Sequence, residues 1–347
     1  MEAIRIKDYY KGRVRGRIVL LFTVCIVIII AVFIDLTLGS YDLSLIGYFK
    51  ELLNNELRNV DKLIMLSIRM PRSLTCIIVG MSLGLSGYYM QTILQNPIAS
   101  PFTLGISSAA SFGASLSIIT NFPFIFMGYN VQISAIFFSI VCTMIMIVSL
   151  KKSKMDAYLM ILAGVAINFF FVALQSLTQY VADEKQVQKI VHWMFGSVSK
   201  ASWTGVIITT VTFVFIFIIT YRKSWSFNLI SFSDDRAKSM GLDTEKFRRF
   251  IFLSSSILTA VAISYVGTIG FIGLLAPHFS RFLLGNDARF TATGSALLGA
   301  MLLILASIVS KIILPGALLP IGIIMNIVGV PFMILIVARG KNGFKSI

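Results

Sequence analysis

Ten long apolar runs, separated by short polar segments, constrain this chain more than any other feature. A membrane-spanning helix needs about 20 predominantly apolar residues. We expect spans near residues 18–38, 63–84, 98–119, 131–150, 157–180, 203–221, 248–267, 269–284, 291–312 and 319–338. The 57% hydrophobic and 13% charged residues agree, because soluble domains are about half apolar and a quarter charged. The sequence therefore predicts an all-α polytopic membrane protein with about ten transmembrane helices.

Two of these runs, the third and the eighth, are interrupted by proline. Pro97 and Pro101 fall at the start of the third run, and Pro277 falls within the eighth. Irregular backbone at membrane depth is tolerated only where it is buried in protein or lines a cavity. These two places are therefore candidates for a pathway through the protein.

The segment from Arg69 to Ser108 combines cations, small residues and a turn. Glycine or serine recurs within its apolar run, at Gly80, Ser82, Gly84, Ser86 and Gly87, and the turn Asn96-Pro97 follows. Small residues let helices approach one another closely in a membrane. We expect this run to be a packing face.

The net charge of +15 could indicate a nucleic-acid partner, but the cations do not form one face. They lie in the polar gaps between apolar runs, where Lys and Arg set membrane topology. With the N-terminus inside, inner segments hold 21 of the 30 Lys and Arg. This bias predicts both termini in the cytoplasm and no nucleic-acid partner.

Residues for catalysis or cofactor binding are sparse. The chain lacks a phosphate-binding Gly-rich loop of the P-loop type, and its histidines, His192 and His278, are far apart. The three cysteines have unrelated spacing, which indicates neither a disulfide framework nor a metal site. We find no acid–base pair within an apolar run, as ion-coupled transporters generally need. We expect no catalytic residue, metal or cofactor; an intramembrane enzyme or sensor is a remote alternative.

Two connecting segments have helical patterns. Residues 228–247 predict two short helices broken at Gly241, with Ser233 as an N-cap and acidic residues after it,. This segment is either a docking element for a cytoplasmic partner or a solvated, basic loop. Residues 183–193 predict either a short helix across the mouth of the protein or an ordinary interfacial loop.

Several motifs resemble those of the FecCD-type family, the permease subunits of ATP-binding-cassette (ABC) importers for iron–siderophores, haem and cobalamin. In chain order they are RMPR at 69–72, VGMSLGLSG at 79–87, QNP at 95–97, LGISS at 104–108, LAGVA at 162–166, AKSMGL at 237–242, GFIGLLAPHFSR at 270–281, LPIG at 319–322 and GVPF at 329–332. Each motif is modest alone, but together they run in family order over residues 65–335.

The resemblance implies a complex in the cytoplasmic (inner) membrane of a bacterium. Its partners would be a second permease subunit, identical or paralogous, two cytoplasmic ATPase subunits and an extracellular or periplasmic binding protein. The chain would be a single multi-pass permease domain over 1–347, with 222–249 as the cytoplasmic coupling loop. It would translocate its cargo by alternating access, while a separate subunit hydrolyses ATP.

The resemblance also implies roles for individual residues. Those predicted to couple to the ATPase are Ser233, Asp234, Ala237, Met240, Gly241 and Leu242. Those predicted to dock the binding protein, or else to position helix ends at the interface, are Arg69, Arg72 and Lys311. Polar residues that either line the pathway or form interhelical hydrogen bonds are Gln91, Asn168, Gln175 and Asn326.

The cargo is predicted by family frequency to be a ferric siderophore, with haem second and cobalamin third. Gate candidates are Asp156, Ala157 and Tyr158, which precede the Leu-Ala-Gly stretch. Cobalamin permeases carry short hydroxyl residues there. This departure weakens a cobalamin assignment.

Overall fold

The computed structural model describes residues 2–39, 41, 59–122, 128–313 and 319–343, and all regular structure in these ranges is helical. The elements are α1 (Glu2–Thr37), α3 (Asn59–Leu63), the π-helix η1 (Ile64–Arg69), α4 (Met70–Ile93), α5 (Ile106–Thr120), α6 (Asn130–Ser149), α7 (Ala157–Val181), α8 (Glu184–Met194), α9 (Trp203–Tyr221), α10 (Ser224–Ile230), α11 (Asp234–Ser239), α12 (Thr244–Val266), α13 (Ile272–Leu284), α14 (Ala288–Ile313) and α15 (Ile321–Gly343).

Each predicted apolar run corresponds to one helical segment. Seven segments are long and apolar enough to cross a membrane: Gly12–Thr37, Val60–Ile93, Asn130–Ser149, Ala157–Val181, Trp203–Tyr221, Thr244–Val266 and Ala288–Ile313. Three shorter apolar helices, Ile106–Thr120, Ile272–Leu284 and Ile321–Leu335, account for the remaining runs. The all-α polytopic fold predicted from the sequence is confirmed.

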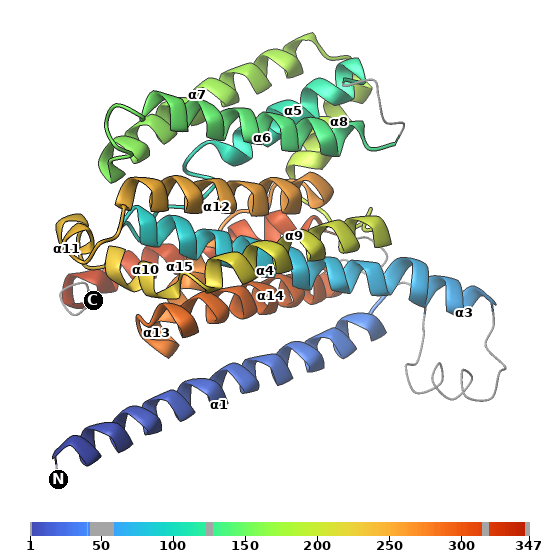
Figure 1. Ribbon diagram of the computed structural model, residues 1–347. Helices are drawn as coiled ribbons and strands as arrows, with labels where there is room; N and C mark the ends of the chain where they lie inside the picture. The colour runs from blue at the N-terminus through green and yellow to red at the C-terminus, as the bar shows by residue number, and fades with distance from the viewer. Residues whose placement is uncertain (1, 40, 42–58, 123–127, 314–318, 344–347) are drawn as a thin grey trace.

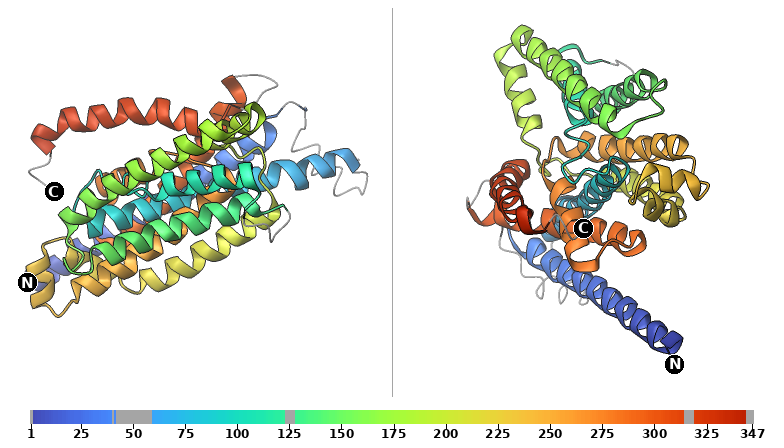
Figure 2. Two further views of the ribbon diagram at one scale, coloured as in Figure 1. Left: turned by 90° about the horizontal axis from the view of Figure 1, so that it is seen from above. Right: turned by 90° about the vertical axis from the view of Figure 1, so that its left-hand side faces the viewer.

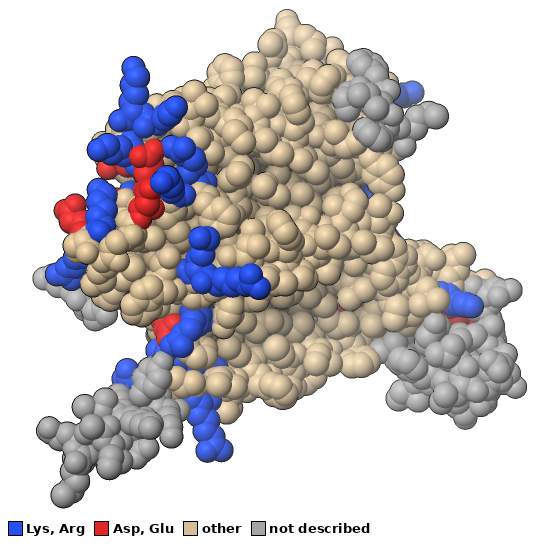
Figure 3. All heavy atoms as spheres, in the orientation of Figure 1, with Lys and Arg blue, Asp and Glu red and all other residues tan. Residues whose placement is uncertain are grey.

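The start of α1 and the end of α15 lie at one end of the helix bundle, together with α10, α11 and the last turn of α13 (Figure 1). Lys and Arg side chains gather over the same end (Figure 3). We call it the basic end, and the opposite end the far end. Further views show α1 along one side of the bundle, α7 and α8 on another, and α15 set apart from the central helices (Figure 2).

The core is built around α4, whose side chains are buried along most of its length. Glycine makes this possible against α14: a Cβ placed on Gly80 would lie 2.8 Å from the Ala300 Cα, and one on Gly84 would lie 3.2 Å from the Gly299 Cα. Such close backbone approach is how small residues stabilise helix pairs in lipid. The predicted packing face is confirmed.

The third run begins with irregular backbone at its prolines, as predicted. In the eighth run the predicted interruption at Pro277 was wrong, because α13 continues through Pro277 and the irregular backbone lies before it, at residues 267–271. The helix bounds also differ from the expected ones. The second span extends to Ile93 rather than residue 84, and the third helix begins at Ile106 rather than residue 98. Gly105, with φ of 83°, precedes that start. On α13, the residue before the first turn is Phe271 with φ of 64°, an unusual left-handed conformation for an aromatic residue.

Candidate functional site

The segment predicted to dock a cytoplasmic partner forms two short helices, α10 and α11, at the basic end. The predicted break at Gly241 is confirmed, because α11 ends at Ser239 and α12 begins at Thr244. A second break, at residues 231–233, separates α10 from α11 and was not predicted. Ser233 is the N-cap of α11, as predicted, and its Oγ accepts a hydrogen bond from the Arg236 N–H at 3.3 Å. A serine cap satisfies one of the free N–H groups at a helix start, which is why the new helix begins here.

Gly241 lies in the connection between α11 and α12. Its φ of 87° suits glycine, and a Cβ placed there would meet nothing within 4 Å. Asp243 then caps α12 by accepting from the Lys246 N–H at 3.0 Å. This hydrogen bond and one from the Lys246 side chain hold the pKa of Asp243 below its usual range.

The apolar side chains of this segment are divided between the core and the surface. Ala237 is fully buried and Leu242 packs against the core, whereas Met240 is 63% exposed. Phe232, between the two helices, is 68% exposed. Two large apolar side chains are thus presented to the outside of the basic end.

Helix α10 is held to the bundle by aromatic contacts. The Phe227 ring stacks on Tyr89 with centroids 5.1 Å apart and meets Phe247 edge-on at the same distance. The Asn228 Oδ1 accepts a hydrogen bond from the Ala288 N–H at the start of α14, at 2.9 Å. The position of α10 is therefore fixed by α4, α12 and α14.

Gln91, a candidate for lining the pathway, forms the interhelical bonds that were its other predicted role. Pro277 has no N–H, so the helix leaves the Gly273 carbonyl without its usual donor. The Gln91 Nε2 donates to that carbonyl at 3.2 Å, and the Arg281 Nη1 donates to the Gln91 Oε1 at 2.5 Å. Gln91 is 3% exposed. Its side chain compensates for the proline in α13.

The other three pathway candidates come from α7 and α15. Gln175 is buried, and its Nε2 contacts the Met194 Sδ at 2.6 Å. Asn168 is half-buried. Asn326 is exposed, and its Oδ1 lies 3.0 Å from where a Cβ on Gly270 would be. These contacts place Asn326 beside the irregular segment before α13.

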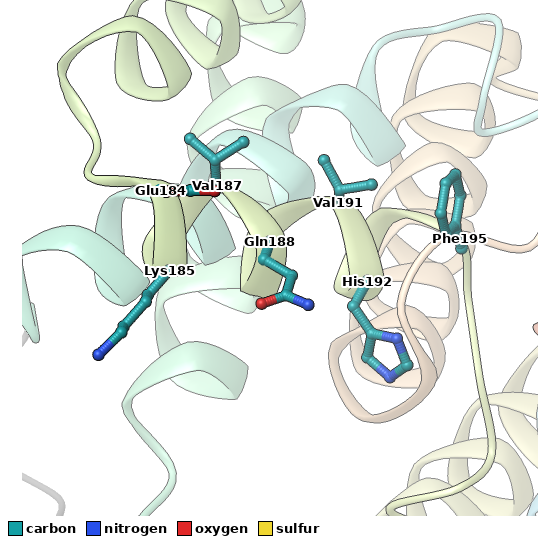
Figure 4. A pocket seen from close by; sticks show the side chains of 7 residues that line it. All are labelled: Glu184, Lys185, Val187, Gln188, Val191, His192 and Phe195. Atoms are coloured by element: carbon teal, nitrogen blue, oxygen red, sulfur yellow. The ribbon is translucent and has the colours of Figure 1, made fainter.

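Helix α8 confirms the short helix predicted for residues 183–193. Asp183 and Gln186 form a capping box at its start, with reciprocal side-chain to backbone hydrogen bonds. One face of the helix borders an open hollow of about 720 Å³ (Figure 4), lined by Glu184, Lys185, Val187, Gln188, Val191, His192 and Phe195.

The end of α8 is joined to the same irregular segment. The Thr268 Oγ1 donates to the Met194 carbonyl, and the Gly322 N–H donates to the Gly196 carbonyl at 3.3 Å. The Ser197 N–H donates to the Val266 carbonyl at 2.7 Å. Helix α8, residues 267–271 and the start of α15 therefore meet at the far end.

The gate candidates start α7. Asp156 is its N-cap, and its Oδ1 accepts from the Leu159 N–H at 3.0 Å. Ala157 is the first helical residue, and Tyr158 is 73% exposed. A capping role explains the carboxylate at position 156, and both Asp156 and Tyr158 are exposed.

Two of the three cations predicted to dock a binding protein are engaged inside the chain. Arg69 is 5% exposed and donates to the carbonyls of Leu36, Thr37 and Tyr41. The Lys311 side chain is 6% exposed and pairs with Asp35 at 2.8 Å. Their burial favours the other role predicted for them, that of positioning helix ends, because both cations hold the end of α1 to the bundle.

Arg72, the third cation, is half-buried, and its Nη2 donates to the Ser199 carbonyl at 3.2 Å. Its position at the far end is compatible with either of its predicted roles.

The far end also contains a buried charged pair that contradicts our sequence analysis, which expected no acid–base pair in an apolar run. The Asp35 side chain is fully buried. It accepts hydrogen bonds from Ser73 at 2.5 Å and Ser307 at 2.8 Å, in addition to Lys311. Asp35 and Lys311 are 276 residues apart, so their pairing has no local sequence signal.

Among the described residues, no group of three or more His, Cys, Asp or Glu side chains is placed to hold a metal ion. The polar groups of the site serve instead as caps, interhelical hydrogen bonds and ion pairs. The described part of the site is therefore a helical scaffold held together by these contacts.

The chain was compared with known proteins, and a family model matches most of it. Residues 27–339 match the model of the FecCD transport family. A "Probable iron chelatin transport system permease protein" of Helicobacter pylori is 31% identical over 92% of this chain and 97% of its own length. The "Hemin transport system permease protein HmuU" of Yersinia pestis is 30% identical over 95% of this chain and 98% of its own length.

A solved structure has the same fold. It is described as "An inward-facing conformation of a putative metal-chelate type ABC transporter", and it superposes with a TM-score of 0.83. It is 30% identical in sequence and covers 92% of this chain and 99% of its own.

Proposed function

We propose that this chain, which belongs to the FecCD transport family, moves ferric siderophores through the membrane as a permease subunit of an ABC importer. Membership of the family makes it a multi-pass translocation subunit that works with other ABC subunits, and not an enzyme. The finer assignments below, to cargo, partners and residues, are our proposals.

The observation that carries the coupling mechanism is the pair of short helices at the basic end. Helices α10 and α11 are fixed to α4, α12 and α14, yet they present Phe232 and Met240 to the outside. We assign them to a cleft on a cytoplasmic ATPase, with the basic end in the cytoplasm. The residues carrying this contact are Ser233, Asp234, Ala237, Met240, Gly241 and Leu242.

The assembly follows from that orientation. Two permease subunits, each a single domain over 1–347 with 222–249 as the coupling loop, sit with two ATPases in the cytoplasmic membrane of a bacterium. A binding protein docks on the far end, where Arg72 is its remaining cationic candidate. ATP binding closes the ATPases, and the coupling helices carry the movement to the spans in alternating access.

The pathway in this proposal runs past α7, α8, α15 and residues 267–271, which meet at the far end. Gln175, Asn168 and Asn326 are its polar candidates, and Asp156, Ala157 and Tyr158 form the gate at the basic end of α7. Siderophore cargo is supported by the relative named for iron chelatin and by the metal-chelate description of the solved structure. The relative named for hemin makes haem the second candidate.

Cargo can be tested directly with the complex reconstituted in liposomes with its ATPases and binding protein. We expect ATP-dependent uptake of a ferric siderophore labelled with radioactive iron, and uptake of hemin and cobalamin at least tenfold lower. Uptake of hemin or cobalamin at the siderophore rate would contradict the cargo assignment but leave the ABC permease assignment intact.

Coupling can be tested in the same liposomes with Gly241→Trp and a matched control. Gly128 also has positive φ, 95°, and open space around it, but it lies in the connection between α5 and α6 at the far end. We expect Gly241→Trp to reduce uptake at least tenfold and Gly128→Trp to leave it within twofold. Equal uptake by both variants would exclude a coupling role for Gly241.

A further inference from the structure

Arg248, on α12, is a buried cation at the basic end with partners on two other elements. Its side chain is 2% exposed. The Nε donates to the Ile93 carbonyl at 2.8 Å, while the two Nη atoms donate to the Asp234 carboxylate at 2.5 and 2.6 Å. One planar guanidinium therefore contacts the end of α4 and the start of α11 at the same time.

Each of these partners is at the terminus of its helix. Ile93 is the last residue of α4, and the last four carbonyls of a helix have no partner within it. Asp234 is in the first turn of α11, where a carboxylate also favours the helix dipole. Since the contacts involve helix ends, Arg248 fixes where α11 begins relative to where α4 stops.

Gln95 provides a second link between the same elements. It lies just beyond α4 with φ of 48°, and its Nε2 donates to the Ile230 carbonyl at 2.7 Å and to the Asp234 Oδ1 at 3.3 Å. The last carbonyl of α10 and the first carboxylate of α11 are thus both joined to the residue that follows α4 closely, Gln95. Residues 231–233, between α10 and α11, are bounded by these bonds.

The geometry requires arginine. A bidentate guanidinium–carboxylate pair is directional, because two parallel N–H···O bonds fix the relative orientation of the groups. Lysine has one compact ammonium and cannot bind both carboxylate oxygens and the Ile93 carbonyl in this arrangement. A rigid joint, rather than mere charge neutralisation, is the property that the Arg248 contacts supply.

We propose that Arg248 is a positioning residue that makes α11 and the basic end of α4 move as one body when the ATPases close. This inference rests on the proposed function, in which α10 and α11 contact the ATPase. Movement received by α11 then passes first to α4, which is the core helix packed against α14, and from there to the rest of the bundle.

The test uses the full complex with the variants Arg248→Gln, Arg248→Lys and Asp234→Asn. The matched control is Arg249→Gln, because Arg249 forms its ion pair within α12, with Glu245 at 2.6 Å. We expect Arg248→Gln to reduce the amount of siderophore imported per ATP hydrolysed at least tenfold, Arg248→Lys to reduce it less, and Arg249→Gln to change it less than twofold. If Arg248→Gln does not fold, the import ratios of Arg248→Lys and Asp234→Asn test the proposal instead. Arg248→Lys retains the buried positive charge and Asp234→Asn retains a hydrogen-bond acceptor, so both are milder changes.

A distance measurement separates this role from general stability. Spin labels at Lys238 on α11 and Ile98, five residues beyond α4, are both on exposed positions. In the otherwise native chain we expect the same label distance with and without ATP, and in Arg248→Lys a distance that shifts or broadens on ATP binding.

An ATP-dependent distance change in the native chain, or a native import ratio in all the Arg248 and Asp234 variants, would overturn the inference. Failure of the native chain to assemble with ATPase subunits would instead contradict the proposed function. The two failures are therefore distinguishable.

Discussion

The charged pair at the far end is enclosed, whereas the pair at the basic end is partly open. The Asp35 carboxylate and the Lys311 ammonium are 0% and 6% exposed and are surrounded by α1, α4 and α14. At the basic end Arg248 is equally buried, but the side chain of its partner Asp234 is 31% exposed.

The helices that the two pairs join also differ. The far-end pair connects three long helices, and Arg69 adds further bonds to the last carbonyls of α1. The basic-end pair connects long helices to α11, which has six residues. The comparison shows that the far end is fixed by a fully buried ion pair, Asp35 with Lys311. At the basic end the ion pair joins the bundle to the short helix α11, and water still reaches its carboxylate. We expect movement to enter at the basic end.

The strongest way to break this comparison is Lys311→Met. It leaves the Asp35 carboxylate buried without its cation, and breaking a buried pair in this way costs about 3–5 kcal/mol. We expect a correspondingly large loss of thermal stability for the purified protein. The double variant Asp35→Leu with Lys311→Met should recover most of it. A single variant that unfolds like the native protein would show that the far end is not fixed by this pair.

The next test acts on the seam between α4 and α14, which connects the two ends. Gly80→Val would place a side chain against the Ala300 backbone, and overpacking of this kind costs about 1–3 kcal/mol. We expect a lower melting temperature than for Gly16→Ala, a control on α1 where a Cβ would meet nothing within 4 Å. Equal melting temperatures of the two variants would show that α4 and α14 can separate enough to accept the valine side chain.

A smaller effect is expected for Gln91→Leu, which removes the donor to the Gly273 carbonyl. Interhelical hydrogen bonds in membranes contribute about 0.6–1.7 kcal/mol, and we expect a loss of stability in that range. In a Pro277→Ala background the helix regains its own N–H donor, so the same change should cost less. A full penalty in both backgrounds would show that Gln91 does not act through the proline.

The smallest effect concerns pH at the basic end. Hydrogen bonds from Arg289, above all, hold the pKa of Asp287 below its usual range, and Arg17 on α1 pairs with it at 3.6 Å. A carboxylate with a lowered folded-state pKa contributes stability above its unfolded pKa, about 3.9, and loses it as pH falls through the folded value.

We therefore expect acidification from pH 5 toward pH 3 to lower the free energy of unfolding by about 0.2–1 kcal/mol, as the contacts of Asp287 with arginine are lost. The melting temperature of Asp287→Asn should lack this part of the pH dependence. Parallel melting curves for the native protein and the variant over this range would contradict the prediction.

The sequence allowed the helices to be predicted because long apolar runs have few alternatives in lipid. The Ser233 cap and the short helix α8 could also be predicted, because a capping residue bonds to backbone within one turn of itself and its signal is therefore local,. The start of α5 was misplaced because an apolar run does not show where prolines and a left-handed glycine end the helical backbone. The break between α10 and α11 was missed because residues 231–233 contain neither glycine nor proline.

Contacts between residues far apart in the sequence could not be predicted, for a different reason. Asp35 with Lys311, and Arg248 with the end of α4, depend on how helices distant in sequence pack. The docking role of Arg69 and Lys311 was predicted from the family resemblance alone. Their burial reflects free carbonyls and a carboxylate that only the folded bundle brings near them.

The two contacts of α1 define a length. Arg17 meets Asp287 at the basic end, and Asp35 is held at the far end. The 18 residues between them rise about 27 Å in an α-helix, close to the roughly 30 Å thickness of a bilayer's hydrocarbon core. In a membrane with longer acyl chains α1 cannot slide or tilt to follow without losing one contact. The bilayer must become thinner around α1, so that the lipids, and not the protein, deform to relieve the hydrophobic mismatch.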